Sequence, residues 1–298
     1  MHAQPQTFGG KVAVWIEELL RHEERLDAVQ ERVLVVQFGG AVGTLASLAP
    51  NGLAFRKDVA KALGLGTYLS NWHNARDSVT ELAMSLGNIC ATLARIAQNL
   101  NSLGSTEIAE ISEAGEAGRG RSTSMAHKRN PRAAEFGEAV ARLGRQRAMG
   151  MIEVAGQEHD RCGGTWIAEW MLLPETFLLT SGALKWALDL IHRLDVHADK
   201  MRANTDMMNG LALTERFTLE LARRMSKFEA REILDKASAD CRTSGRALSD
   251  ILKCMPEVAA ALNLDEIDAI ANPAAYTGAA SEIVDNVLTA AEARDIGR

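Results

Sequence analysis

Apolar residues follow a helical period without a slip between Val79 and Leu100. Successive apolar positions in this stretch are three residues or one residue apart, so the apolar side chains fall on one face of a helix. A half-buried strand would instead alternate apolar and polar residues. The pattern therefore predicts one long helix in the protein core. Its apolar positions are Val79, Leu82, Ala83, Leu86, Ile89, Cys90, Leu93, Ile96, Ala97 and Leu100.

Helical periodicity extends to most of the chain, because its six prolines leave long tracts in which helices can run uninterrupted. No stretch alternates convincingly, so no strand is predicted. Several of the expected helices are longer than the average of about 11 residues in globular proteins, and long helices pack lengthwise. The sequence thus predicts an elongated all-α long-helix bundle. The further helices are expected at about 10–35, 54–64, 131–158, 165–193, 212–225, 227–242 and 281–294.

A change in helix length marks a domain boundary near Asn209-Gly210. The helices expected after this point are shorter and are separated by loop signals at 243–245, 255–256 and 272–273. We therefore expect a central long-helix domain over 1–209 and a small C-terminal helical domain over 210–298.

Composition excludes several classes of function. The chain of 298 residues carries a net charge of −6, so it lacks the basic field that drives binding to nucleic acid or to anionic membranes. No membrane span or signal peptide is expected, which predicts a cytoplasmic protein. The four cysteines are far apart and predict neither a metal site nor disulfides. Any anion must therefore be bound locally.

One polar segment, 113–131, stands out among the regular helices. It contains several glycines and hydroxyls, and it ends in Asn130, expected as a helix N-cap, followed by Pro131 in the first turn. Glycine-rich loops that lead into a helix N-terminus bind anions, because unpaired backbone N–H groups converge there. The segment thus predicts a carboxylate or phosphate site, although a solvated basic loop fits its composition equally well. Its cationic side chains are Arg119, Arg121, Lys128 and Arg129.

The stretch 122–131 resembles the signature loop of the fumarase/aspartase superfamily, G-S-S-x-M-P-x-K-x-N-P. Further segments fit this superfamily in the same order: 3–9, 37–44, 106–110 and 204–215. Within the superfamily, the segments 37–48, 158–170 and 276–280 are most similar to the bacterial cycloisomerases that act on 3-carboxy-cis,cis-muconate. The resemblance extends over essentially the whole chain.

Some positions depart from the family pattern. In the signature, Arg121 stands in place of glycine, Thr123 in place of the second serine and Ala126 in place of proline. The chain also begins inside the preceding family motif, T-H-x-Q-x-A-x-P, with Ala3 and Pro5 at its end, so His2 does not correspond to the catalytic histidine of that motif. We therefore expect an N-terminally shortened chain in which these departures alter activity.

The resemblance implies addition and elimination on carboxylated substrates without a cofactor or a metal. Ser122 corresponds to the family's catalytic base. Because serine is a poor base, nearby cations must lower its pKa. Lys128 and Asn130 correspond to residues that hold a substrate carboxylate. Thr123, in the same loop, is expected to bind the substrate with them.

Three further residues are expected to act on the substrate. Arg161 would bind an additional carboxylate, or else form a surface ion pair with Glu158 or Asp160. His159 and His127 would serve as acids, since histidine titrates near neutral pH, or else be structural.

Two other patterns have structural explanations. Segment 37–44 contains three glycines, but no strand precedes it and no Walker lysine follows it, so close helix packing is favoured over phosphate binding. Trp166 and Trp170 are four residues apart and can share one helix face, where core packing is favoured over ligand stacking.

The family implies a homotetramer whose active sites are shared between subunits and take a small polycarboxylate. Lactone formation from 3-carboxymuconate, a step of protocatechuate breakdown, is the leading hypothesis. A fumarate-releasing lyase of the adenylosuccinate lyase type is a second hypothesis, although segment 161–170 is unlike the serine-rich stretch expected there. A catalytically inactive helical oligomer is the third.

Overall fold

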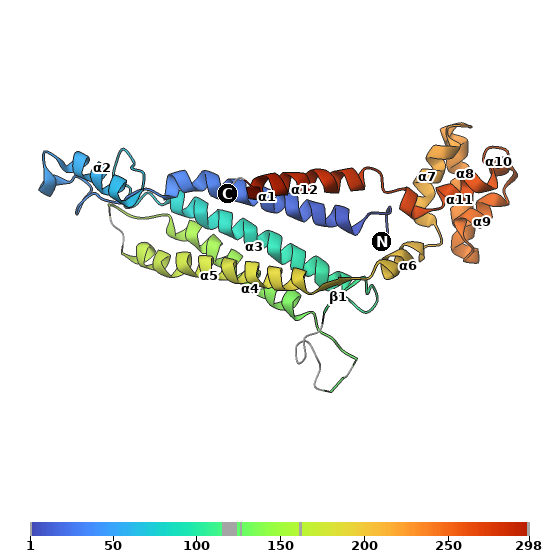
Figure 1. Cartoon of the computed structure of the whole chain (residues 1–298), viewed down its shortest axis with the longest axis horizontal. Helices are drawn as coiled ribbons and strands as arrows, with labels where there is room; N and C mark the ends of the chain where they lie inside the picture. The colour runs from blue at the N-terminus through green and yellow to red at the C-terminus, as the bar shows by residue number, and fades with distance from the viewer. Residues whose placement is uncertain (1, 115–123, 126, 161–162, 297–298) are drawn as a thin grey trace. The chain divides into compact units, whose positions relative to one another are not determined.

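The computed structural model describes residues 2–114, 124–125, 127–160 and 163–296, and these residues are predominantly helical (Figure 1). The contacts divide the chain into two units. One comprises Glu17–Ser105 and Ile111–Asp195; the other comprises Met1–Ile16, Thr106–Glu110 and Val196–Arg298. These bounds differ from the boundary at 209/210 expected from the sequence, which remains a prediction about the domains.

Long helices form the first unit, which we call the bundle unit. After the second half of α1 (Phe8–Val33) come α2 (Gly52–Leu63), α3 (Asp77–Leu103), α4 (Arg132–Val154) and α5 (Gly164–His192). The helix expected at 79–100 is α3, and its apolar face is buried as predicted. The expected long-helix architecture is thus confirmed for the described residues.

Small residues let α3, α4 and α5 approach closely. A Cβ atom added to Gly144 of α4 would lie 2.7 Å from the Sγ of Cys90 on α3 and 3.2 Å from the Cβ of Leu179 on α5. Likewise, a Cβ on Gly87 would lie 2.8 Å from the Cβ of Ala148. Glycine is therefore required at these helix contacts, because interiors packed this densely leave no room for another carbon.

Two short strands correct the expectation that the chain has none. β1 (Ile111–Glu113) pairs with β2 (Leu194–Val196), and the N–H of Ala114 donates to the carbonyl of Arg193 at 2.6 Å. Strands of three residues are too short to show a recognisable alternation in the sequence. The pair ties the chain before α4 to the chain after α5.

The second unit, which we call the C-terminal unit, is also helical and has its own apolar core, formed by residues between 213 and 270. This core contains Phe217, Leu221, Leu248, Leu252 and Ile267, all almost fully buried. The unit's helices are α6 (Ala198–Asp206), α7 (Thr214–Leu221), α8 (Lys227–Ser244), α9 (Leu248–Lys253), α10 (Pro256–Ala259), α11 (Leu264–Ile270) and α12 (Ala280–Ile296).

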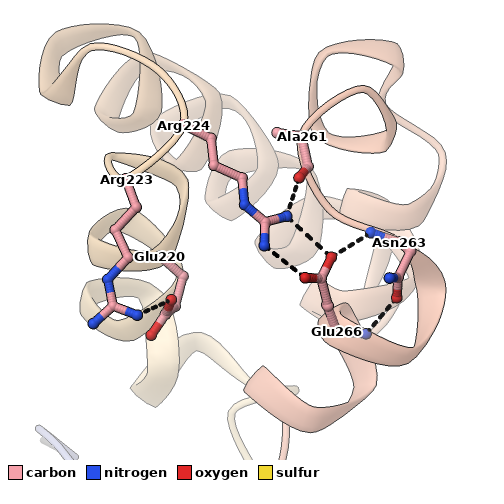
Figure 2. A network of polar contacts seen from close by, with 6 residues as sticks. All are labelled: Glu220, Arg223, Arg224, Ala261, Asn263 and Glu266. Atoms are coloured by element: carbon pink, nitrogen blue, oxygen red, sulfur yellow. Dashed lines mark hydrogen bonds and ion pairs between the residues drawn. The ribbon is translucent and has the colours of Figure 1, made fainter.

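An arginine–carboxylate fork fastens α11 to the turn after α7 (Figure 2). Arg224 donates to both carboxylate oxygens of Glu266, at 3.0 and 2.6 Å, and to the carbonyl of Ala261. Glu266 also accepts from the backbone N–H of Asn263 at 2.8 Å, completing a capping box. These donors, Arg224 first and the Asn263 amide second, lower the pKa of Glu266 to about 2, so the fork stays ionised well into the acid range.

Candidate active site

The polar segment singled out in the sequence leads into α4, but this helix begins differently from the prediction. The N-cap is Pro131 rather than Asn130, and no side-chain hydrogen bond caps the helix from that position. Instead, the carboxylate of Glu113, at the end of β1, accepts from the backbone N–H groups of Ala133 and Ala134 at 3.1 and 3.0 Å. These N–H groups, expected to be available to a bound anion, are thus satisfied by the chain's own carboxylate.

A small cavity of about 50 Å³ adjoins this helix start. Glu113, Arg129, Asn130 and Pro131 line it together with apolar residues of α3 and α5. Its volume suits one or two water molecules rather than a polycarboxylate. The described residues of one chain therefore do not enclose a substrate-sized site at this point.

The predicted site residues near α4 are only partly described. His127 and Lys128 are exposed and Asn130 is half-buried. The backbone N–H of Lys128 donates to the carbonyl of Met125 at 3.1 Å, which folds the loop into a turn just before the helix. Ser122 and Thr123, with Arg121 and Ala126, lie outside the described residues.

The second group of predicted residues follows α4. The side chain of His159 is exposed, and its backbone φ is +52°, a left-handed conformation that non-glycine residues rarely adopt. The side-chain amide of Asn74 donates to the carbonyl of His159 and so fixes this turn. Arg161 lies outside the described residues.

A buried ion pair joins the start of α3 to α5, and it was not predicted from the sequence. Arg76, just before α3, donates through Nε to Oε2 of Glu169 on α5 at 2.7 Å and through Nη2 to the other carboxylate oxygen. Both side chains are less than 10% exposed, and the guanidinium lies over the Trp72 ring, 5.4 Å from its centroid. The acid at position 169 could be read from the sequence, but its distant partner could not.

The tryptophan pair differs from the favoured expectation of core packing. Trp166 and Trp170 meet edge to face with ring centroids 5.1 Å apart, as their spacing allows. However, Trp170 is 56% exposed and Trp166 only half-buried. The rings therefore form an aromatic patch on the surface of α5.

The two groups of predicted residues lie at opposite ends of α4. This helix has 23 residues, which at 1.5 Å per residue gives a length of about 35 Å. Lys128 and Asn130 precede its first turn, whereas His159 follows its last turn. The structure therefore does not bring these residues together within one copy of the chain.

The described residues lack two further kinds of feature. Within these ranges no helix is both long and apolar enough to cross a membrane. Nor do three or more His, Cys, Asp or Glu side chains gather there as a metal site would require.

The fold and the signature segment define a class of protein. Residues 1–145 match the family described as Lyase, and residues 210–287 match the family described as Adenylosuccinate lyase C-terminus. Together with the long-helix bundle, these matches show that the chain belongs to the fumarase/aspartase superfamily.

Particular relatives refine this assignment. The chain is 36% identical to the 3-carboxy-cis,cis-muconate cycloisomerase of Bradyrhizobium diazoefficiens and 37% identical to that of Acinetobacter baylyi, over 98% and 97% of its own length. It is also similar to the crystal structure of the 3-carboxy-cis,cis-muconate lactonizing enzyme from Pseudomonas putida, with a TM-score of 0.90 and 33% identity over 97% of this chain and 64% of that one. The chain spans 64% of the length of both curated relatives.

Proposed function

We propose that this protein is a 3-carboxy-cis,cis-muconate cycloisomerase that forms a carboxymuconolactone in the cytoplasmic breakdown of protocatechuate. The observation that carries this proposal is the similarity to cycloisomerases over nearly the whole chain, including the segment between α4 and α5. The fold provides long helices that can hold a loop and a turn rigidly at their ends.

The chemistry requires a base and several cations. One carboxylate of the substrate adds to a double bond of the same molecule, and a proton is added to the carbon beside another carboxylate. Negative charge develops on that carboxylate, where Lys128 and Asn130 would stabilise it. In the reverse direction Ser122 would remove the same proton. Thr123 and Arg161 would bind the remaining carboxylates. In the forward direction the Ser122 hydroxyl would give the proton to that carbon, and His159 or His127 would act as the acid that restores the proton on Ser122.

We further propose that the active protein is a homotetramer whose sites combine residues of different copies. Support comes from α5, which carries apolar side chains on its exposed side as well as in the core. Its buried residues are Glu169, Thr176, Thr180, Ala183 and Leu190. Many of its large apolar side chains are exposed, on a face that suits packing against helices of another copy. They are Ile167, Trp170, Met171, Phe177, Leu178, Leu184, Leu188 and Ile191.

The test is the loss of the conjugated diene absorbance of 3-carboxy-cis,cis-muconate. We expect the parent protein to remove this absorbance and Ser122→Ala to lose at least about a hundredfold in rate, the lower range for removing an acid–base group. Ser281→Ala, at an exposed hydroxyl on α12, is the matched control and should keep the parent rate. Equal rates for both variants would refute the role of Ser122.

Two outcomes would favour the other hypotheses. Fumarate released from adenylosuccinate, with the diene left intact, would identify a lyase of that type, which the match of 210–287 also allows. An oligomer that neither reacts with nor is thermally stabilised by either substrate would be the inactive scaffold, since a ligand of the folded state must raise apparent stability.

A further inference from the structure

A polar pocket of about 420 Å³ lies between α1 and α3 in the bundle unit, and none of its residues belongs to the candidate active site. Arg21, His22 and Arg25 line it from α1, while Thr92 and Arg95 line it from α3. Glu18 is the sole carboxylate among its lining residues. Three guanidinium groups thus gather in a protein whose net charge is −6.

A chain of hydrogen bonds fixes the geometry of this pocket. Nη1 of Arg25 lies 3.2 Å from Nδ1 of His22. A guanidinium can only donate, so Nδ1 accepts and the ring proton resides on Nε2. Nε2 then donates to the hydroxyl of Thr92 at 2.8 Å, and that hydroxyl donates to Glu18 at 2.6 Å. Arg95 donates to the other oxygen of Glu18.

The charges in the pocket do not cancel. Arg95 neutralises Glu18, and Arg21 is paired at the exposed rim with Glu17 at 3.2 Å. Burial, and next the charge of Arg25, lower the pKa of His22, so its ring is neutral at physiological pH. Among the described residues that line the pocket, Arg25 therefore bonds to the neutral His22 and forms no ion pair with a carboxylate.

We propose that this pocket binds a small oxyanion, either phosphate or a dicarboxylate, through Arg25 and Arg21. The planar fork of arginine matches the two oxygens of a carboxylate or phosphate. The volume falls in the range of about 300–1,000 Å³ that is usual for small-molecule sites. The buried His22 holds the guanidinium of Arg25 in place, which reduces the entropy lost on binding. This site does not depend on the proposed cycloisomerase activity.

Calorimetric titration with inorganic phosphate and, separately, with succinate tests the proposal and distinguishes the two sources of the anion. Arg25→Gln removes a charge-assisted pair with the anion and should weaken binding at least about tenfold. The matched control is Arg142→Gln, which removes an exposed arginine of α4 and should leave binding unchanged. Equal weakening by both variants, or no heat with either anion, would overturn the site.

Two further measurements distinguish anion binding in this pocket from anion binding at the candidate active site. The titration is repeated with Lys128→Ala, which removes a proposed carboxylate-binding residue of the active site, and the pocket's affinity should persist. In addition, the ring resonances of His22, assigned by comparison with His22→Gln, should shift on adding anion to the parent protein but not to Arg25→Gln. Binding lost in Lys128→Ala, or a His22 signal that stays unmoved, would place the anion elsewhere and refute the proposal.

Discussion

Glu169 is a buried carboxylate that depends on a partner 93 residues earlier in the chain. Its two oxygens are held by Arg76, and removing one member of such a pair leaves the other charge buried and uncompensated. The sequence could place Glu169 in a segment similar to the cycloisomerases, but no local pattern could reveal its pairing with Arg76. Tertiary ion pairs of this kind have no periodicity, so they become visible only in the folded structure.

We predict that Glu169→Gln lowers the free energy of unfolding by about 3–5 kcal/mol. The control is Glu175→Gln on the same helix, whose partner Arg147 and own side chain are both more than 40% exposed. An exposed pair contributes at most about 1 kcal/mol, so this control should change little. Urea unfolding of the three proteins measures the difference. Similar losses for both variants would show that burial does not determine how much the Arg76–Glu169 pair contributes to the free energy of unfolding.

At the scale of elements, α4 shows how a helix start can be misjudged from local signals. Asn130 followed by Pro131 is a strong N-cap pattern, yet the N–H groups of the first turn are bound by Glu113. This carboxylate comes from β1, and β1 is held in turn by its pairing with β2. The cap was unpredictable because it depends on a strand pair of three residues each.

We therefore expect Glu113→Ala to lower the free energy of unfolding by about 0.5–2 kcal/mol, the usual cost of losing an N-cap. Glu135→Ala, in the first turn of the same helix, serves as the control because its carboxylate pairs with the exposed Arg132 at 3.1 Å. The two are compared by thermal and urea unfolding. If Glu135→Ala proves the more costly change, Glu113 does not cap α4.

Helix existence was more predictable than helix ends. The strongly periodic α3 was expected at 79–100 and spans Asp77–Leu103, and α5 was expected at 165–193 and spans Gly164–His192. The expected helix at 131–158 ends at Val154, before the turn that contains His159. The short helices α6 and α9 to α11 were not predicted, because four to nine residues give too few turns to establish a period.

At the scale of the whole molecule, the main finding is that the residues of the candidate site lie at both ends of α4. The sequence correctly indicated the superfamily, because its signature motif is local. The helix expected at 131–158 already implied that the residues before it and after it lie far apart, and α4 separates them by about 35 Å within one copy. Only an assembly of copies could join the two groups, and the exposed apolar face of α5 provides a surface for it.

This division predicts complementation between defective copies. Ser122→Ala damages the loop before α4, and Arg161→Gln damages the segment after it. Each variant alone should be nearly inactive in the diene assay. In oligomers formed by co-expression, half of the loops and half of the segments are intact, so about a quarter of the sites combine two intact parts.

The control for complementation is co-expression of Ser122→Ala with Lys128→Ala, which damage the same loop. A site in this mixture always contains a damaged loop, so no activity should return. Recovery in the first mixture alone would support sites built from different copies. Equal recovery in both mixtures, or none in the first while hybrid oligomers are demonstrated by affinity tags on the two variants, would contradict a site divided along α4.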